Sequence, residues 1–159
     1  MKDLDWSNLS FGYRQTDYNV RCYYRDGKWG EIEVCSDEYL KLHMAATCLH
    51  YGQEAFEGLK AYRCPDGKVR VFRMDENAKR LQSTCRGILM PEVPTEMFEE
   101  MVKKVVRLNQ EWIPTYESGA TLYIRPLLIG TSAQVGVHPS KEYCFLIFVT
   151  PVGPYFKGG

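Results

Sequence analysis

The sequence TLYIRPLLI at residues 121–129 and the sequence YCFLIFVT at residues 143–150 predict two strands late in the chain. The second stretch is apolar without a break, which indicates a strand that is buried on both faces. In the first stretch, alternation places Leu122 and Ile124 on one face and Tyr123 and Arg125 on the other. We therefore expect the first strand to pack one face against a core and to turn a polar face away from it.

Earlier in the chain, two pairs of alternating runs flank turns that contain glycine, and each pair predicts an antiparallel hairpin. The hairpins comprise residues 20–25 and 29–34, joined at Asp26-Gly27, and residues 58–63 and 68–72, joined at residues 64–67. In the second turn, Pro65 and Gly67 favour the dihedral angles that a tight turn needs.

Two amphipathic helices are predicted between the hairpins and the late strands. The first has Asp75 as its N-cap, repeats apolar residues at helical spacing and stops before Pro91. The second runs from about Thr95 to Trp112, with apolar residues along one face. The order of strands, helices and strands predicts the α+β class, as a mostly antiparallel sheet backed by helices.

The composition excludes several classes of protein. Of the 159 residues, 45% are hydrophobic, which is too many for a disordered chain, and no run approaches the roughly 20 apolar residues of a membrane-spanning helix. Lysine plus arginine equals aspartate plus glutamate at 20 each, so no nucleic-acid partner is indicated. The start of the chain lacks a secretory signal, and the six cysteines are spread singly. We expect a cytoplasmic protein of one domain, with reduced thiols and no metal site.

Three stretches suggest chemistry. Tyr123 and Arg125 offer a phenol and a guanidinium to a carboxylate, although an ordinary solvent-facing strand would show the same pattern. In residues 49–58, two glycines bracket a short segment that can approach a ligand, and Glu57 fits an ion pair better than a general base. Arg80, early in the first predicted helix, suits an anion such as phosphate or else lies in solvent.

Six segments together resemble branched-chain amino-acid aminotransferases, which are pyridoxal-phosphate enzymes of fold type IV. They occur in the order of that family and span nearly the whole chain. They are Phe11-Gly12 with Thr16-Asp17-Tyr18, LHYGQEAFEGLKAY (49–62), FRMDENAKR (72–80), LYIRP (122–126), GVHP (136–139) and, in the last stretch, PVGPYF (151–156).

The resemblance implies amino transfer between leucine, isoleucine or valine and 2-oxoglutarate, with glutamate as the other amino acid and pyridoxal 5'-phosphate as cofactor. It implies that Arg80 binds the cofactor phosphate. It assigns Val137 to the active site of a partner subunit, and therefore implies a homodimer. The remaining matched positions line the substrate pocket: Phe11, Tyr51, Phe56, Tyr123, Arg125 and Tyr155.

One part of the family pattern is missing from the 159 residues. The family lysine that holds the cofactor follows the segment resembling PVGPYF, in a second domain, and Lys60 matches a non-catalytic strand position instead. We therefore expect residues 1–150 to be the small N-terminal domain and residues 151–159 to begin the interdomain linker. The second domain would be absent, and the chain would be inactive alone and would not retain the cofactor.

Other interpretations stay open from the sequence alone. A D-amino-acid aminotransferase or an aminodeoxychorismate lyase would share the fold family. The chain could instead serve as a non-catalytic domain, or be an unrelated α+β binding module. The last alternative predicts that Tyr51, Tyr123 and Arg125 lie on different surfaces.

Overall fold

The structure, a computed structural model, describes residues 1–154. Its strands are β1 (Asn19–Arg25), β2 (Lys28–Trp29), β3 (Glu33–Cys35), β4 (Glu54–Phe56), β5 (Leu59–Arg63), β6 (Val69–Val71), β7 (Thr121–Gly130) and β8 (Tyr143–Val152). Its helices are α1 (Thr47–Tyr51), α2 (Met74–Gly87) and α3 (Thr95–Leu108), with short 3₁₀ turns at Trp6–Asn8 and Gln110–Trp112.

Within residues 1–154, eight strands form one sheet in the order β2-β1-β8-β7-β5-β6, with β3 added beside β1 and β4 beside β7. Every pairing is antiparallel, and the longest joins β7 to β8 from Thr121↔Val152 to Gly130↔Tyr143. Within this open sheet the first strand, β1, pairs with the last one, β8, so the two ends of the described chain meet in its interior.

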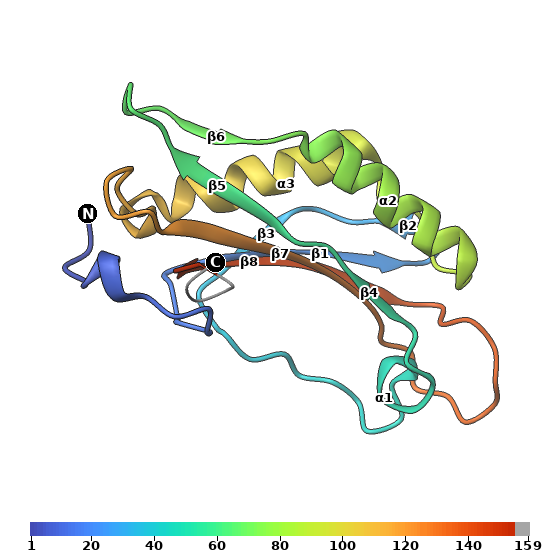
Figure 1. The fold of residues 1–159 in the computed structure, drawn as a ribbon. Coiled ribbons are helices and arrows are strands. Elements are labelled where there is room, and N and C mark those ends of the chain that lie inside the picture. Colours follow the sequence, from blue (N-terminus) through green and yellow to red (C-terminus); the bar gives the residue numbers. More distant parts are fainter. Residues whose placement is uncertain (155–159) are drawn as a thin grey trace.

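Helices α2 and α3 cover one face of this sheet (Figure 1). Helix α3 buries residues at helical spacing, among them Phe98, Met101 and Val105, and Phe98 stacks on Phe145 of β8 with ring centroids 6.0 Å apart. Burying one such side chain contributes about 1.5–3 kcal/mol. This arrangement confirms the predicted α+β class with its mostly antiparallel sheet.

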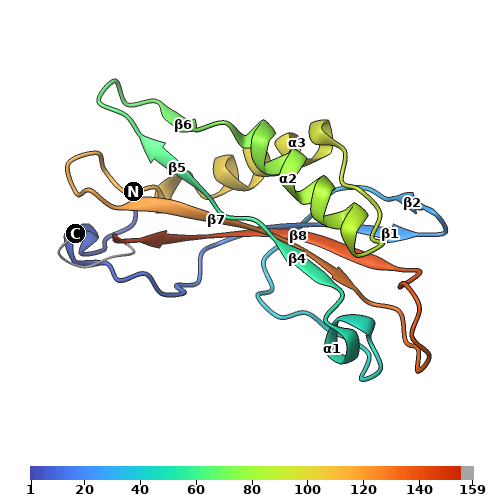
Figure 2. The same ribbon diagram turned by 45° about the vertical axis from the view of Figure 1, so that its right-hand side comes forward.

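The opposite face of the sheet is more open. Figure 2 shows α1 on this side of the sheet, next to the loop that joins β7 to β8. A smaller apolar cluster lies here, formed by Ala46, Cys48, Ile129, Cys144 and Leu146. Because the two helices occupy the other face, the polar residues of β7 are left accessible on this one.

Both predicted hairpins are present, but the first differs in detail. Its second strand is divided into β2 and β3, because Tyr24 pairs with Trp29 whereas Val20 pairs with Val34, one residue out of step. The extra residue forms a bulge, at which the Gly30 amide donates to the Tyr23 carbonyl at 2.8 Å. The second hairpin pairs as predicted, with Ala61 opposite Val71.

The ends of the first predicted helix were placed wrongly. Asp75 lies inside the first turn of α2 rather than at its N-cap, which is Arg73 in a left-handed conformation with φ 45°. The Asp75 carboxylate instead accepts the Arg73 guanidinium at 3.1 and 3.2 Å. At the other end, the helix stops at Gly87 because left-handed Leu89 lets the Met90 amide bond the Cys85 carbonyl at 2.9 Å, a Schellman ending.

The second predicted helix is shorter than expected. Helix α3 stops at Leu108, and Trp112 lies in a following 3₁₀ turn. Between them, Asn109 is fully buried and its side chain bonds four backbone groups: the amides of Asp17 and Tyr18, and the carbonyls of Tyr18 and Val105. Asn109 thus connects the N-terminal segment to α3 at the point where the helix ends.

The C-terminal strand extends slightly beyond the predicted domain. β8 continues through Val152, so two residues of the expected linker belong to the sheet. The boundary between domain and linker at residue 150 stays a prediction. All six cysteines are free thiols in the structure. No helix in the described part of the chain combines the length and the apolar character needed to cross a membrane.

Candidate functional site

The centre of β7 carries the predicted pair. Leu122 and Ile124 are fully buried under the helices, whereas Tyr123 and Arg125 lie on the open face, as the alternation predicts. Arg125 donates from Nη2 and Nε to the Tyr123 hydroxyl at 3.0 and 3.3 Å. Among residues 1–154, no carboxylate lies within ion-pair distance of Arg125.

Aromatic rings surround this guanidinium. Its carbon lies 4.6 Å from the ring centre of Phe56 and 5.2 Å from that of Tyr123. Phe56 is opposite Leu127 in the pairing of β4 with β7, which places it on the same face as Arg125. Phe11 makes an edge-to-face contact with Tyr123 at 5.2 Å. The arrangement combines apolar surface with a cation that has no acidic partner in the described chain.

A glycine lets the chain pass close to the phenol. A methyl group at Gly58 would lie 2.7 Å from the Tyr123 hydroxyl, closer than a real Cβ atom comes. The segment from Phe56 to Gly58 therefore runs directly against the β7 pair. Phe56 is 61% exposed, whereas Glu57 is only 4% exposed. Their side chains therefore leave the segment in opposite directions.

Glu57 connects this segment to helix α2. Its two carboxylate oxygens accept Nε and Nη2 of Arg80 at 2.8 and 2.6 Å, and Oε2 also accepts the Asn77 amide at 3.0 Å. The hydrogen bonds and the charge of Glu57 raise the pKa of the Arg80 guanidinium above its usual value. Glu57 thus forms an ion pair, as the sequence suggested, and Arg80 remains 69% exposed at its side chain.

The surroundings of Arg80 fit a phosphate group. The surface here is hollowed, and its lining carries three cations, one acid, two neutral polar side chains and one aromatic ring: Arg73, Lys79, Arg80, Glu76, Asn77, Ser83 and Phe72. Arg73 and Lys79 also contact Glu76, at 2.9 and 3.3 Å. A guanidinium beside an ammonium and a hydroxyl is a donor set that matches phosphate oxygens.

Two predicted residues lie apart from this group. Tyr51, at the end of α1, donates from its hydroxyl to the carbonyl of Val135, in the loop that joins β7 to β8. Val137 in the same loop is 85% exposed. Gly130, where this loop begins, is five residues from Arg125, which is about 16 Å along a strand. Within residues 1–154, neither a hydrogen bond nor a ring contact joins Tyr51 to Arg125.

The loop with Val137 is held in place by side chains that the sequence analysis did not single out. Gln53 accepts the Ser140 amide at 2.9 Å and donates to the Tyr143 hydroxyl at 3.2 Å. Ser132 accepts the Lys141 amide at 2.6 Å. The bonds of Gln53 join residues far apart in sequence, and only its position beside Gly52 could have suggested a role.

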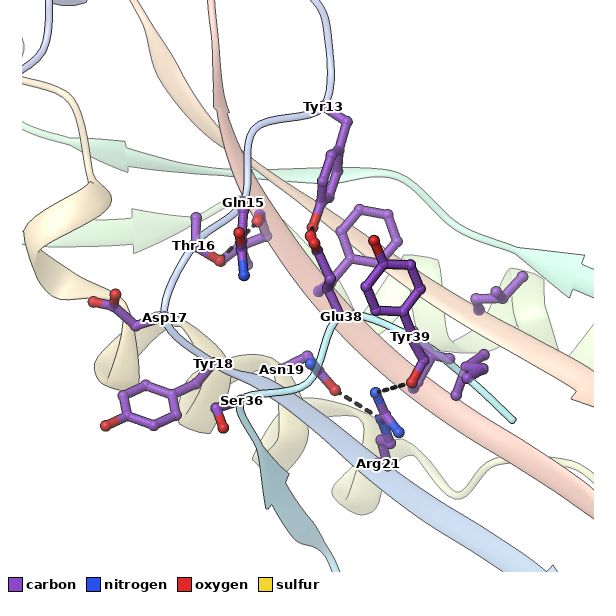
Figure 3. A pocket seen from close by; sticks show the side chains of 15 residues that line it. Tyr13, Gln15, Thr16, Asp17, Tyr18, Asn19, Arg21, Ser36, Glu38 and Tyr39 are labelled. Atoms are coloured by element: carbon purple, nitrogen blue, oxygen red, sulfur yellow. Dashed lines mark hydrogen bonds between the residues drawn. The ribbon is translucent and has the colours of Figure 1, made fainter. Parts of the chain in front are cut away.

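A further hollow of about 400 Å³ lies on the open face (Figure 3). It adjoins the Arg125 group, because Tyr13 and Phe148 line both this hollow and the one next to Tyr123 and Arg125. Several of its polar side chains bond to one another or to the backbone. Tyr13 donates to Glu38 at 2.7 Å, and burial together with this bond raises the pKa of Tyr13 to about 12. Arg21 donates to the Asp37 carbonyl at 2.6 Å. Of the predicted site residues within 1–154, none lines this hollow.

Two further predictions concern Tyr155 and the absence of a metal site. Tyr155 lies outside the described residues. In residues 1–154, no group of histidine, cysteine, aspartate and glutamate side chains is arranged to hold a metal ion. The described site residues thus form one connected group, from Phe11, Phe56, Tyr123 and Arg125 through Glu57 to Arg80, and a second group with Tyr51 and Val137.

No protein-family model matches the chain. Over its whole length it is 53% identical to a branched-chain-amino-acid aminotransferase of Haemophilus influenzae, 46% of which is covered. Its fold is similar to the branched-chain amino acid aminotransferase of Escherichia coli, with a TM-score of 0.69 and 26% identity over 90% of this chain and 42% of that one. The T.th. branched-chain amino acid aminotransferase, solved with pyridoxamine 5'-phosphate, gives a TM-score of 0.61 and 25% identity over 84% of this chain and 40% of that one.

These similarities confirm the resemblance to branched-chain aminotransferases that the six segments predicted. The chain spans about half the length of the curated relatives it matches. That coverage fits a single N-terminal domain of such an enzyme.

Proposed function

We propose that the protein to which this chain belongs is a branched-chain-amino-acid aminotransferase, and that this domain supplies its substrate wall and part of its cofactor site. The observation that carries the proposal is the setting of Arg125, a guanidinium among aromatic rings with no acidic partner in residues 1–154. Such a site accepts an aliphatic side chain against the rings and a distal carboxylate at the guanidinium. The two amino donors, leucine and glutamate, differ in these two features.

The cofactor we propose is pyridoxal 5'-phosphate, which supplies the electron sink that amino transfer requires. Arg80 would bind its phosphate, because the exposed guanidinium lies in a hollow with further cations. The similarity to a structure that contains pyridoxamine 5'-phosphate supports this assignment. The residue that holds the cofactor covalently would come from the rest of the protein.

The proposed assembly is a homodimer. Tyr51 is bonded to the loop that carries Val137, and this loop begins at the end of β7, where Gly130 is about 16 Å of strand away from Arg125. Side chains that resemble active-site residues but lie that far from the group around Arg125 are suited to completing the site of a second subunit. The braced and exposed loop at residues 131–142 supports this role.

The test uses the full-length protein with pyridoxal 5'-phosphate added. We expect transfer of the amino group from L-leucine, L-isoleucine and L-valine to 2-oxoglutarate, measured as glutamate formation. D-alanine and aminodeoxychorismate serve as competing substrates. Turnover of either of these, with no transfer from L-leucine, would assign the protein to a relative within the fold family and overturn the proposal.

A further inference from the structure

Glu57 is a buried carboxylate that pairs with Arg80 and has no part in substrate or cofactor binding in the function proposed above. Its side chain is 4% exposed and accepts three hydrogen bonds, two from Arg80 and one from Asn77. Arg80 and Asn77 are three residues apart on α2, so they face Glu57 from the same side of the helix. A buried carboxylate costs stability unless it is paired and hydrogen-bonded, and both conditions are met here.

The bonds to Glu57 leave a defined edge of Arg80 for another ligand. A guanidinium carries five N–H donors: one on Nε and two on each Nη atom. Glu57 takes Nε and Nη2, the side edge of the group. The end edge, formed by Nη1 and the second hydrogen of Nη2, is the one that can still bind two phosphate oxygens in parallel.

Glu57 is itself held from the sheet. Its backbone amide donates to the carbonyl of Pro126 at 2.9 Å, and Pro126 directly follows Arg125 in β7. The Asn77 side chain also donates to the Gly58 carbonyl at 3.3 Å. The backbone at Glu57 and Gly58 is therefore bonded to β7 on one side and to α2 on the other. The orientation of the Arg80 guanidinium is therefore set by the strand that carries Arg125.

We propose that Glu57 is a positioning residue for phosphate recognition, which holds the side edge of Arg80 so that its end edge faces the phosphate. This inference rests on the proposed function, in which Arg80 binds the phosphate of pyridoxal 5'-phosphate. Through Glu57, the phosphate site and the Arg125 site keep a fixed spacing across the sheet. That spacing suits a cofactor and a substrate that react with each other.

The test compares pyridoxal 5'-phosphate with pyridoxal, which lacks the phosphate, in the full-length protein. The dissociation constant of each is measured by equilibrium dialysis, and their ratio gives the preference for the phosphorylated form. Glu57→Gln removes a negative charge near the phosphate, so electrostatics alone would raise the preference. Positioning predicts the opposite sign: a fall of about tenfold, roughly the loss of one charge-assisted hydrogen bond.

Three further variants separate the explanations. Glu57→Asp keeps the charge but retracts the carboxylate, and its preference should also fall. Arg80→Ala should lower the preference further, and adding Glu57→Gln to it should cause no further fall, because the positioning effect of Glu57 acts only through Arg80. Glu76→Gln is the matched control, since Glu76 lines the same hollow and contacts Arg73 and Lys79 but not Arg80. Its preference should stay the same or rise.

The outcomes distinguish this inference from the proposed function. An unchanged preference in Arg80→Ala would overturn the phosphate role of Arg80, and the inference with it. A lower preference in Arg80→Ala together with an unchanged or higher one in Glu57→Gln and Glu57→Asp would overturn the inference alone. Equal weakening of both ligands in the Glu57 variants would indicate a general structural role and also overturn it.

Discussion

Replacing Arg125 by alanine should separate the two kinds of substrate that we propose for the full-length enzyme. Among residues 1–154 the guanidinium donates only to the Tyr123 hydroxyl, and it packs on Phe56, so donors remain for a carboxylate. Hydrogen bonds between charged groups contribute about 1.5–3 kcal/mol. Because Arg125 is partly exposed, we take roughly 2–3 kcal/mol for the whole contact, which lowers kcat/KM for 2-oxoglutarate by about 30- to 160-fold.

Leucine has no distal carboxylate, so the same change should affect it much less. What leucine loses is the support of Phe56 by a cation–π contact of roughly 0.5–1 kcal/mol, which corresponds to less than about sixfold. The selectivity between leucine and glutamate as amino donors should therefore shift toward leucine by at least about fivefold.

The assay follows each half-reaction separately, by the absorbance of the cofactor in a single turnover with leucine or with glutamate. Arg125→Lys is the control that keeps the charge but not the planar pair of donors, and it should recover part of the glutamate rate. Tyr123→Phe removes the hydroxyl that orients the guanidinium and should affect glutamate more than leucine. Equal losses for leucine and glutamate in Arg125→Ala would refute the carboxylate role and leave a structural one.

Three further predictions concern the 159-residue chain. Asn109→Ala should lower the free energy of unfolding in urea by roughly 2–4 kcal/mol, because it leaves buried backbone groups unpaired; a loss below about 1 kcal/mol would contradict this. Gly153→Ala would place a methyl group 1.8 Å from the backbone oxygen of Leu9, so it should lower the free energy of unfolding by about 1–3 kcal/mol. Gly87→Ala is the control, because its methyl group would have no atom within 4 Å and should not destabilise α2. Equal urea midpoints for the two variants would refute the contrast. Burial raises the pKa of Cys144 to about 11, so iodoacetamide at about pH 8 should alkylate the more accessible Cys35 first, as peptide mass spectrometry would show.

Local patterns in the sequence predicted the parts of the fold that depend on neighbouring residues. The alternation in β7 assigned Leu122 to the core and Arg125 to the open face, and both assignments are confirmed. The pairing of β1 with β8, at Val20↔Ile147, could not be predicted in this way, because it joins residues at opposite ends of the chain. Asn109 was missed for a related reason: its partners Asp17 and Tyr18 lie more than 90 residues away.

In the candidate site, too, the sequence indicated single residues but not the contacts between residues that lie far apart in the chain. The resemblance to a family assigned Arg80 to a phosphate, and this role stays a prediction, whereas the predicted place of Arg80 on the first long helix is confirmed. Nothing in the sequence linked Arg80 to Glu57, which is 23 residues away across a hairpin and a helix end. The glycine at position 58 gave a clue that the chain comes close to something, and only the structure identifies this as the Tyr123 hydroxyl.

The two arginines of the site differ in a way that matches the two anions we propose for them. Arg80 is paired with a buried carboxylate, so its charge is largely compensated and its orientation is fixed. Such a group suits a phosphate that stays bound through many turnovers, where geometry matters more than charge. Arg125 contacts the Phe56 ring and the ring and hydroxyl of Tyr123 but no carboxylate in the described chain, so it keeps its full charge in a setting that also tolerates an aliphatic side chain. A substrate site that must accept leucine and glutamate in turn requires this second kind of arginine, because a fixed acidic partner would compete with the glutamate carboxylate.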